Sequence, residues 1–68
     1  MRYTKDTFGN VLIVSNREYE FLRKLKVNSK LKIEDLDEYT QEIGYKLYSR
    51  SAIVMDDDEE YFLPIAKD

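Results

Sequence analysis

Apolar and polar positions predict short strands near both ends of the chain and helices between them. Near the N-terminus, the continuous apolar run of residues 11–14 follows a weaker strand pattern at residues 3–5. Gly9 and Asn10 lie between the two, and both tolerate the positive φ that a tight turn requires. The pattern therefore predicts a short N-terminal strand or hairpin within residues 2–14, in which the weak first strand also fits an extended tail.

A second hairpin pattern lies near the C-terminus. Two short runs rich in β-branched and aromatic residues, 52–55 and 61–63, flank five consecutive acidic residues, 56–60. Short apolar runs separated by a polar gap of turn length are typical of a β-hairpin. Pro64 cannot donate a hydrogen bond to a neighbouring strand, so we expect the last strand to be an edge at that point.

The first helix pattern begins after Ser15. Ser15 and Glu18 have the spacing of a capping box, in which each side chain accepts a hydrogen bond from the other residue's backbone N–H. An apolar stripe and a cationic last turn follow, as expected for one buried helix face and a favourable helix dipole. These residues are Phe21, Leu22 and Leu25 for the stripe, and Arg23, Lys24 and Lys26 for the last turn. The pattern predicts a helix that ends near Val27.

A second helical pattern begins at Ile33 and contains an internal glycine. Its periodic positions, three or four residues apart, are Ile33, Leu36, Thr40, Ile43 and Leu47. Gly44 either caps a helix that ends at Ile43, or lies within a helix that continues to about Arg50 at a cost of about 1 kcal/mol relative to alanine. The sustained spacing favours the continuous helix, and a break near residues 39–40 would divide it into two short helices.

Together these elements predict one small α+β domain over residues 1–68, with an N-terminal strand or hairpin, two or three helices and a C-terminal β-hairpin. The net stability expected for a domain of this size is about 3–5 kcal/mol. The order of elements resembles that of a winged helix, in which a helical core precedes a two-stranded wing. The resemblance implies a recognition helix within residues 40–50.

The composition argues against catalysis. The chain has no histidine and no cysteine, so it lacks the commonest general base, the commonest nitrogen ligand of metals and the thiol nucleophile. The acidic run also lacks the alternating spacing of a calcium-binding loop. We therefore expect no enzyme activity, no cofactor and no metal. The longest apolar stretch has four residues, so we expect no membrane contact and, without cysteine, a cytoplasmic location.

The charge distribution is uneven along the chain. Residues 1–32 carry a formal charge of +5 and residues 33–68 carry −8, within a net charge of −3. The acidic run is a candidate contact for a basic partner, although a solvated turn is the simpler interpretation. Six tyrosines exceed what so small a core needs, and tyrosine is common at interfaces. The candidate partner-binding residues are Asp56, Asp57, Asp58, Glu59, Glu60, Tyr45, Tyr48 and Tyr61.

The leading hypothesis is a non-enzymatic protein-binding module, such as a small regulator or inhibitor, whose partner is another protein or a second copy in a homodimer. In one version its carboxylates mimic the charge of nucleic acid. The alternative is a winged-helix-like, DNA-binding transcriptional regulator that uses residues 40–50 and the basic segment 23–32, because cations neutralise phosphates while Gln and Arg can read base edges. The candidate nucleic-acid contacts are Arg23, Lys24, Lys26, Lys30, Lys32, Gln41, Lys46, Ser49 and Arg50.

Overall fold

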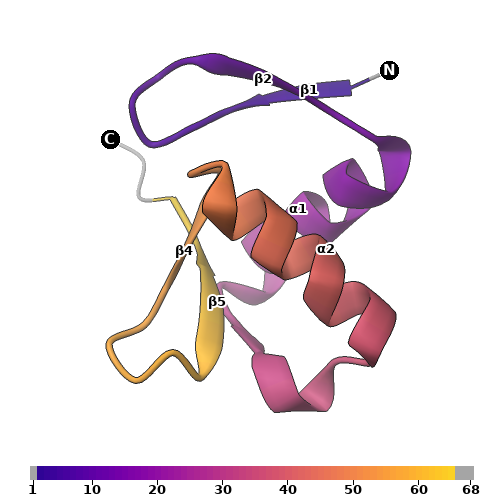
Figure 1. Ribbon diagram of the computed structural model, residues 1–68, viewed down its shortest axis with the longest axis vertical. Coiled ribbons are helices and arrows are strands. Elements are labelled where there is room, and N and C mark those ends of the chain that lie inside the picture. Colours follow the sequence, from indigo (N-terminus) through magenta and orange to yellow (C-terminus); the bar gives the residue numbers. More distant parts are fainter. Residues whose placement is uncertain (1, 66–68) are drawn as a thin grey trace.

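The computed structural model describes residues 2–65 and confirms a small α+β domain (Figure 1). It contains two helices longer than one turn, a two-stranded sheet and a three-stranded sheet. The elements are β1 (Arg2–Lys5), β2 (Val11–Val14), α1 (Asn16–Asn28), β3 (Leu31–Lys32), the 3-10 helix η1 (Ile33–Asp35), α2 (Glu38–Ser49), β4 (Ile53–Met55) and β5 (Tyr61–Pro64).

The predicted N-terminal hairpin is confirmed, and it crosses the end of the molecule at which α2 finishes (Figure 1). Asp6 organises its turn, because Oδ1 of Asp6 accepts from the N–H groups of Phe8 and Asn10 at 2.9 and 2.8 Å. Gly9 has a φ of 86°, as the sequence led us to expect. The backbone N–H of Thr7 donates to the carbonyl of Ser51 (2.9 Å), which attaches the hairpin to the segment after α2.

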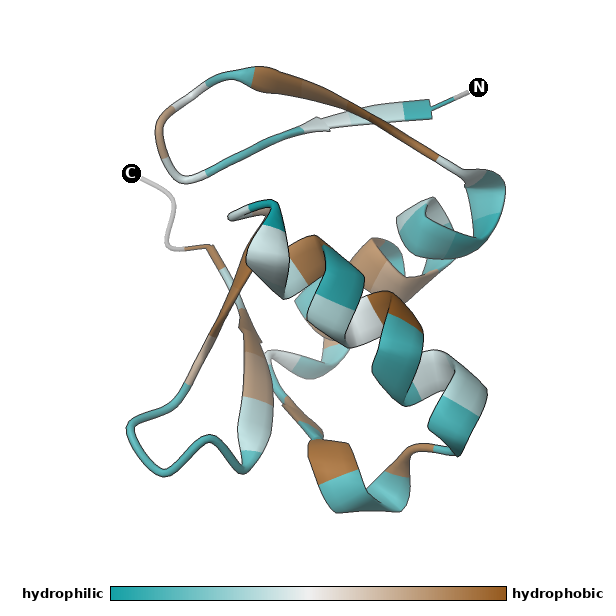
Figure 2. Cartoon of the chain, in the orientation of Figure 1, coloured by the Kyte–Doolittle hydropathy of each residue, from teal (hydrophilic) through white to brown (hydrophobic). Residues whose placement is uncertain are grey.

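The outer face of this hairpin is apolar and open to solvent. Tyr3 and Ile13 are cross-strand partners, and Val11 lies on the same face because side chains alternate along a strand. All three are more than half exposed, whereas Val14 at the end of β2 is buried. Figure 2 shows β2 as one of the most hydrophobic ribbons on the outside of the molecule. The run 11–14 is therefore a strand that leads directly into a helix, and it is not covered on both faces.

Helix α1 has the predicted capping box. Oγ of Ser15 accepts from the N–H of Glu18 (3.1 Å), and Oε1 of Glu18 accepts from the N–H of Ser15 (2.8 Å). Phe21 and Leu25 face the core. The helix ends at Ser29, whose φ of 68° turns the chain towards β3.

The second helical pattern is divided at Leu36 and Asp37, which is earlier than both predicted points, the break near residues 39–40 and the helix end at Ile43. Helix η1 ends at Asp35, Leu36 is extended, and Asp37 caps α2 by accepting from the N–H of Thr40 (3.1 Å). Hydrogen bonding from Thr40 lowers the pKa of Asp37 below its usual value. Helix α2 then continues through Gly44 to Ser49, which confirms the preferred interpretation of that glycine.

The C-terminal hairpin forms as predicted and is completed by a strand that the sequence did not reveal. The three-stranded sheet has the order β3-β5-β4, and all its pairs are antiparallel. Strand β5 is the central strand, but the edge expected at Pro64 is confirmed. At Pro64 itself only Ile53 of β4 is a partner, since β3 pairs with residues 61 and 62 alone.

The core lies between the two long helices and the inner face of the three-stranded sheet. Phe62 of β5 is fully buried at its centre, edge-on to Phe21 of α1 at 5.8 Å and to Tyr45 of α2 at 5.4 Å between ring centroids. The buried hydrophobic residues are Val14, Phe21, Leu25, Ile33, Leu47, Ala52, Ile53 and Phe62. No polar or charged side chain is buried within residues 2–65, so the charged groups described are all at the surface.

Candidate functional site

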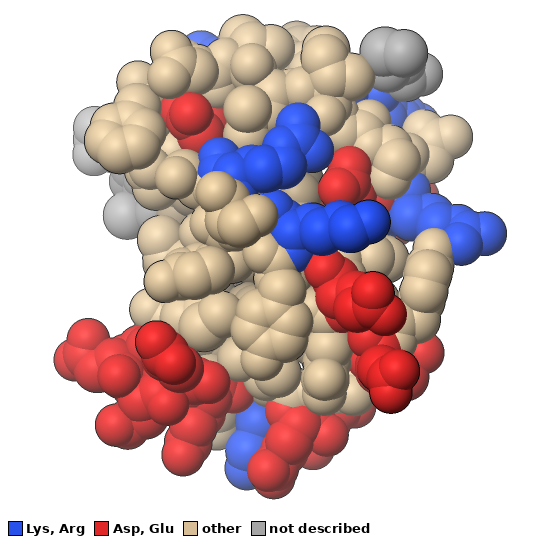
Figure 3. All heavy atoms as spheres, viewed as in Figure 1, with Lys and Arg blue, Asp and Glu red and all other residues tan. Residues whose placement is uncertain are grey.

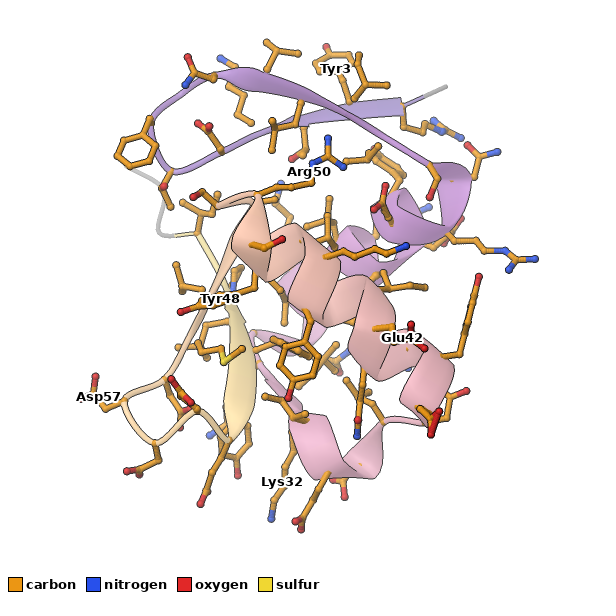
Figure 4. All side chains as sticks on the ribbon, viewed as in Figure 1. Tyr3, Lys32, Glu42, Tyr48, Arg50 and Asp57 are labelled. Atoms are coloured by element: carbon orange, nitrogen blue, oxygen red, sulfur yellow. The ribbon has the colours of Figure 1, made fainter. Side chains whose placement is uncertain are left out.

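The loop between β4 and β5 carries the five consecutive acids and projects from one corner of the molecule (Figure 1). Residues 57–60 are exposed, and Figure 4 shows Asp57 pointing into solvent. No ion pair within the described part of the chain involves these four residues. Their carboxylates are therefore available to a partner, and Figure 3 shows them as a dense acidic cluster at the lower left.

Asp56, the first acid of the run, has a structural role in this loop. Its Oδ1 accepts from the backbone N–H groups of Glu60 (2.7 Å) and Tyr61 (3.0 Å). Its own N–H donates to the carbonyl of Tyr61 (3.2 Å). Asp56 thus closes the loop that presents the other four acids, as Asp6 does in the N-terminal hairpin.

Glu59 occupies a backbone conformation that favours glycine. Its φ is 58°, and its N–H donates to the carbonyl of Asp56 (3.0 Å). In the N-terminal hairpin the corresponding residue, three positions after Asp6, is Gly9, whose N–H donates to the carbonyl of Asp6 (3.1 Å). The glutamate at position 59 therefore carries backbone strain that a glycine at the same position would not have.

We expect Glu59→Gly to raise the free energy of unfolding by about 0.5–1 kcal/mol, because relief of the left-handed strain exceeds the added entropy of the unfolded chain. Urea denaturation followed by circular dichroism measures this change. Asp58→Gly is the matched control, since Asp58 has no positive φ, and it should be destabilising. Equal losses from both substitutions would contradict the strain at Glu59.

Further acids from η1 and α2 extend the charge of the loop. Glu34, Asp35, Glu38 and Glu42 are all exposed, and Figure 3 shows acidic atoms along the bottom and the lower right of the same view. The backbone N–H of Ile33 donates to the carbonyl of Glu60 (2.9 Å), which holds η1 against the loop. We use the name acidic face for the exposed residues Glu34, Asp35, Glu38, Glu42, Asp57, Asp58, Glu59 and Glu60.

A polar hollow joins the two parts of the acidic face. Glu34 lines it from one side, and Glu59 and Glu60 line it from the other. Lys32 also lines it, with its Nζ 3.5 Å from Oε1 of Glu34, and that carboxylate raises the pKa of the lysine amine. In the sequence, the acids between residues 34 and 38 lie at the start of the second helical pattern, with no sign that they approach the loop. Their proximity to the loop depends on β3, which aligns η1 with β5.

The predicted tyrosine contacts lie on two different faces. Tyr45 and Tyr48 are 46% and 43% exposed on α2, and Tyr48 points from the helix towards the side where the acidic loop projects (Figure 4). Tyr61 alternates with the inward-facing Phe62, so it lies on the outer face of the sheet, where Nζ of Lys30 is 4.8 Å from its ring centroid. Tyr61 therefore borders the acidic loop on the outer face of the sheet, whereas Tyr45 and Tyr48 lie apart from it on α2.

Two of the candidate nucleic-acid contacts, Gln41 and Arg50, hydrogen-bond to backbone carbonyls outside α2. Gln41 is half-buried, and its Nε2 donates to the carbonyls of Ile33 (2.8 Å) and Leu36 (3.1 Å). Nη2 of Arg50 donates to the carbonyl of Ile13 (2.6 Å), while its Nη1 lies 3.7 Å from Oε2 of Glu18. Figure 4 shows Arg50 reaching from the end of α2 towards the hairpin. Gln41 and Arg50 are the residues expected from the sequence to read base edges.

The remaining candidate cations and Ser49 are spread over several surroundings. Oγ of Ser49 donates to the carbonyl of Lys46 (2.9 Å), and the side chain of Lys46 is exposed. Lys24 is also exposed, Lys30 lies over Tyr61, and Lys32 pairs with Glu34. Arg23 and Lys26 line a separate cavity beside β1. The basic segment 23–32 therefore does not form one continuous cationic strip with α2.

Other kinds of site find no support within residues 2–65. No group of three or more acidic side chains there is arranged to hold a metal ion. No helix in that part is long and apolar enough to cross a bilayer.

Comparison of the chain with protein-family models, with curated proteins and with solved structures found no significant match.

Proposed function

We propose that the protein is a non-enzymatic protein-binding module whose acidic face binds a basic surface on a partner protein. The observation that carries the proposal is the convergence of Glu59 and Glu60 of the loop with Glu34 of η1 around one polar hollow. Residues 57–60 reach solvent and form no ion pair within the described chain. Clustered charges of one sign steer a partner of opposite charge and favour a defined orientation.

The partner class that fits this arrangement is a protein with a basic groove, including one that normally binds nucleic acid. Carboxylates presented on a projecting loop can occupy positions that phosphates would take in such a groove, since both bind Arg and Lys as oxygen anions. Tyr45 and Tyr48 add exposed aromatic area on α2, which contributes apolar contact at an interface. Together these features support a small regulator or inhibitor.

The experiment replaces residues 57–60 with their amides, as Asp57→Asn, Asp58→Asn, Glu59→Gln and Glu60→Gln, and keeps Asp56 because it closes the loop. Immobilised protein is incubated with nuclease-treated host lysate, and bound proteins are identified by mass spectrometry. For each protein captured, we expect the fourfold variant to lower affinity by about 30-fold at low salt, since exposed charge pairs contribute about 0.5 kcal/mol each. Wild-type binding should weaken as salt is raised.

Glu20→Gln is the control, because Glu20 is an exposed acid on α1 outside the acidic face. It should leave capture unchanged. Equal capture by the wild type and the fourfold variant would reject the acidic face as the binding surface.

A second candidate function is DNA binding, and the order of elements favours it. Helix α1, strand β3, η1, α2 and the β4–β5 hairpin follow one another as in a winged helix, with α2 in the place of the recognition helix. The acidic face includes both the wing loop and the first half of α2, so phosphates would be repelled there. Fluorescence anisotropy titration of mixed-sequence duplexes at low salt separates the two functions: a flat curve rejects DNA binding, and steep salt-dependent binding supports it.

A further inference from the structure

A cavity of about 250 Å³ lies on a different part of the molecule, between the N-terminal hairpin, α1 and the ends of β4 and β5. Its apolar lining includes Leu22 of α1, Ile53 of β4 and Pro64 of β5. Tyr19 of α1 adds aromatic surface and β1 contributes residues 3–5, so three separate parts of the fold border one mainly apolar space.

Within residues 2–65, the charged residues that line this cavity are all cations. They are Lys5 of β1 and Arg23 and Lys26 of α1, and no aspartate or glutamate of that range lines the cavity, although the whole chain has a net charge of −3. None of the three forms an ion pair with another residue in the range 2–65. The cavity therefore combines an apolar interior with unbalanced positive charge.

We propose that this cavity binds a small amphiphilic carboxylate, with the apolar body among Leu22, Ile53 and Pro64 and the carboxylate beside Arg23 and Lys26. The volume is just below the range of about 300–1,000 Å³ typical of drug-sized ligands, so the ligand is a short aliphatic or aromatic acid. The guanidinium of Arg23 and the ammonium of Lys26 are donors of the kind that bind carboxylates. Inorganic phosphate is polar on all sides, so the apolar lining would leave most of its surface without hydrogen-bond partners.

The site is independent of the acidic face in both chemistry and position. Its lining comes from β1, α1, the segment after α2 and the C-terminal ends of the sheet, and it shares no residue with the acidic hollow. A ligand there would contact the hairpin and the helices at once, and so would hold β1 against α1. Loss of partner binding through the acidic face would leave this site unchanged.

Octanoate and octylammonium are matched probes, with equal chain length and opposite charge. The full chain, labelled with ¹⁵N, is titrated with each probe and followed by heteronuclear NMR. We expect octanoate to shift amide signals of residues 3–5, 19–26 and 52–53 with a dissociation constant of about 0.1–1 mM, as the small number of ligand atoms permits. Octylammonium should bind at least about ten-fold more weakly, because the three cations repel it.

Two double variants with the same loss of charge test the location. Arg23→Gln with Lys26→Gln should lower the octanoate affinity about five-fold, as two exposed charge pairs allow. Lys24→Gln with Lys30→Gln removes two cations of the same basic segment that do not line the cavity, and should change the affinity less than two-fold. All four positions are exposed, so neither variant threatens the fold.

Three outcomes would overturn the proposal. The first is the absence of octanoate shifts up to about 5 mM, and the second is a set of shifts that lies away from the cavity. The third is an equal loss of affinity in the two double variants, which would show attraction by overall charge alone.

Discussion

Phe62→Ala is expected to leave most of the protein unfolded at 25 °C. Phe62 is completely buried, and truncation of a buried phenylalanine to alanine costs about 3–5 kcal/mol. The net stability of a domain this small, without a disulfide, is also about 3–5 kcal/mol. The loss is therefore as large as the whole stability.

The size of the effect follows from the position of Phe62 at the centre of the fold. Its backbone pairs with Leu31 of β3 and Met55 of β4, and its ring lies edge-on to Phe21 of α1 and Tyr45 of α2. Removing the ring opens a cavity that borders both helices. Because the packing on all sides depends on the same ring, neighbouring side chains cannot close the space without moving a helix.

Circular dichroism with urea and thermal denaturation measures the result. Phe8→Ala is the matched control, because Phe8 is 80% exposed at the turn of the N-terminal hairpin and the same atoms are removed. The control should stay within about 0.5 kcal/mol of the wild type. A loss below about 1 kcal/mol for Phe62→Ala would contradict the position of this ring in the core.

Gly44→Ala is expected to lower the free energy of unfolding by about 2 kcal/mol, although alanine is the better helix former by about 1 kcal/mol. A Cβ atom built at Gly44 would lie 2.4 and 2.6 Å from Cε2 and Cζ of Phe62. Both atoms belong to a ring without free space, so the clash cannot be relieved by rotation into solvent. Overpacking of this kind forces helix α2 away from the sheet.

A double-mutant cycle identifies the cause. Phe62→Leu removes ring atoms from the position that the new methyl group would occupy, so Gly44→Ala should cost less in the Phe62→Leu background than in the wild type. Chemical denaturation of the four proteins gives the coupling, which we expect to exceed about 1 kcal/mol. Glu42→Ala, at an exposed position of the same helix, should have little effect on stability. Additive losses within about 0.5 kcal/mol would show that Gly44 and Phe62 do not clash.

Local signals in the sequence predicted several elements correctly. The Ser15 and Glu18 capping box lies where expected, because it depends only on residues three positions apart. Both hairpins also form around turns that short-range chemistry explains, with Gly9 in one and Asp56 in the other. Residues 57–60 of the acidic run are exposed because adjacent carboxylates cannot be buried together.

The division of the second helical pattern was less predictable. The periodic positions run from Ile33 to Leu47 without interruption, but Asp37 caps a new helix and Leu36 becomes extended. The strand β3 has two residues, too few for any periodic pattern. It exists because β5 offers hydrogen-bonding groups on that side, and β5 lies about thirty residues away in the chain.

The surroundings of the candidate functional residues were also not predictable from the sequence alone. Their side-chain types suggested that Gln41 and Arg50 read base edges. In the structure, however, Gln41 donates to the carbonyls of residues 33 and 36, and Arg50 donates to the carbonyl of residue 13. In the sequence, Arg23 and Lys26 belong to a single basic segment, whereas in the fold they line a cavity completed by β1 and β5.

The sequence by itself determined the start of α1, the turns and the exposure of the acidic loop, because each depends on bonds or repulsions between residues close together in the chain. Only the tertiary structure decided that the second helical pattern breaks at Leu36, that β5 is the central strand and that two acidic segments share one hollow. Those features depend on which surfaces meet when Phe62 is buried. Contacts between residues far apart in sequence leave no periodic or local pattern from which they could be predicted.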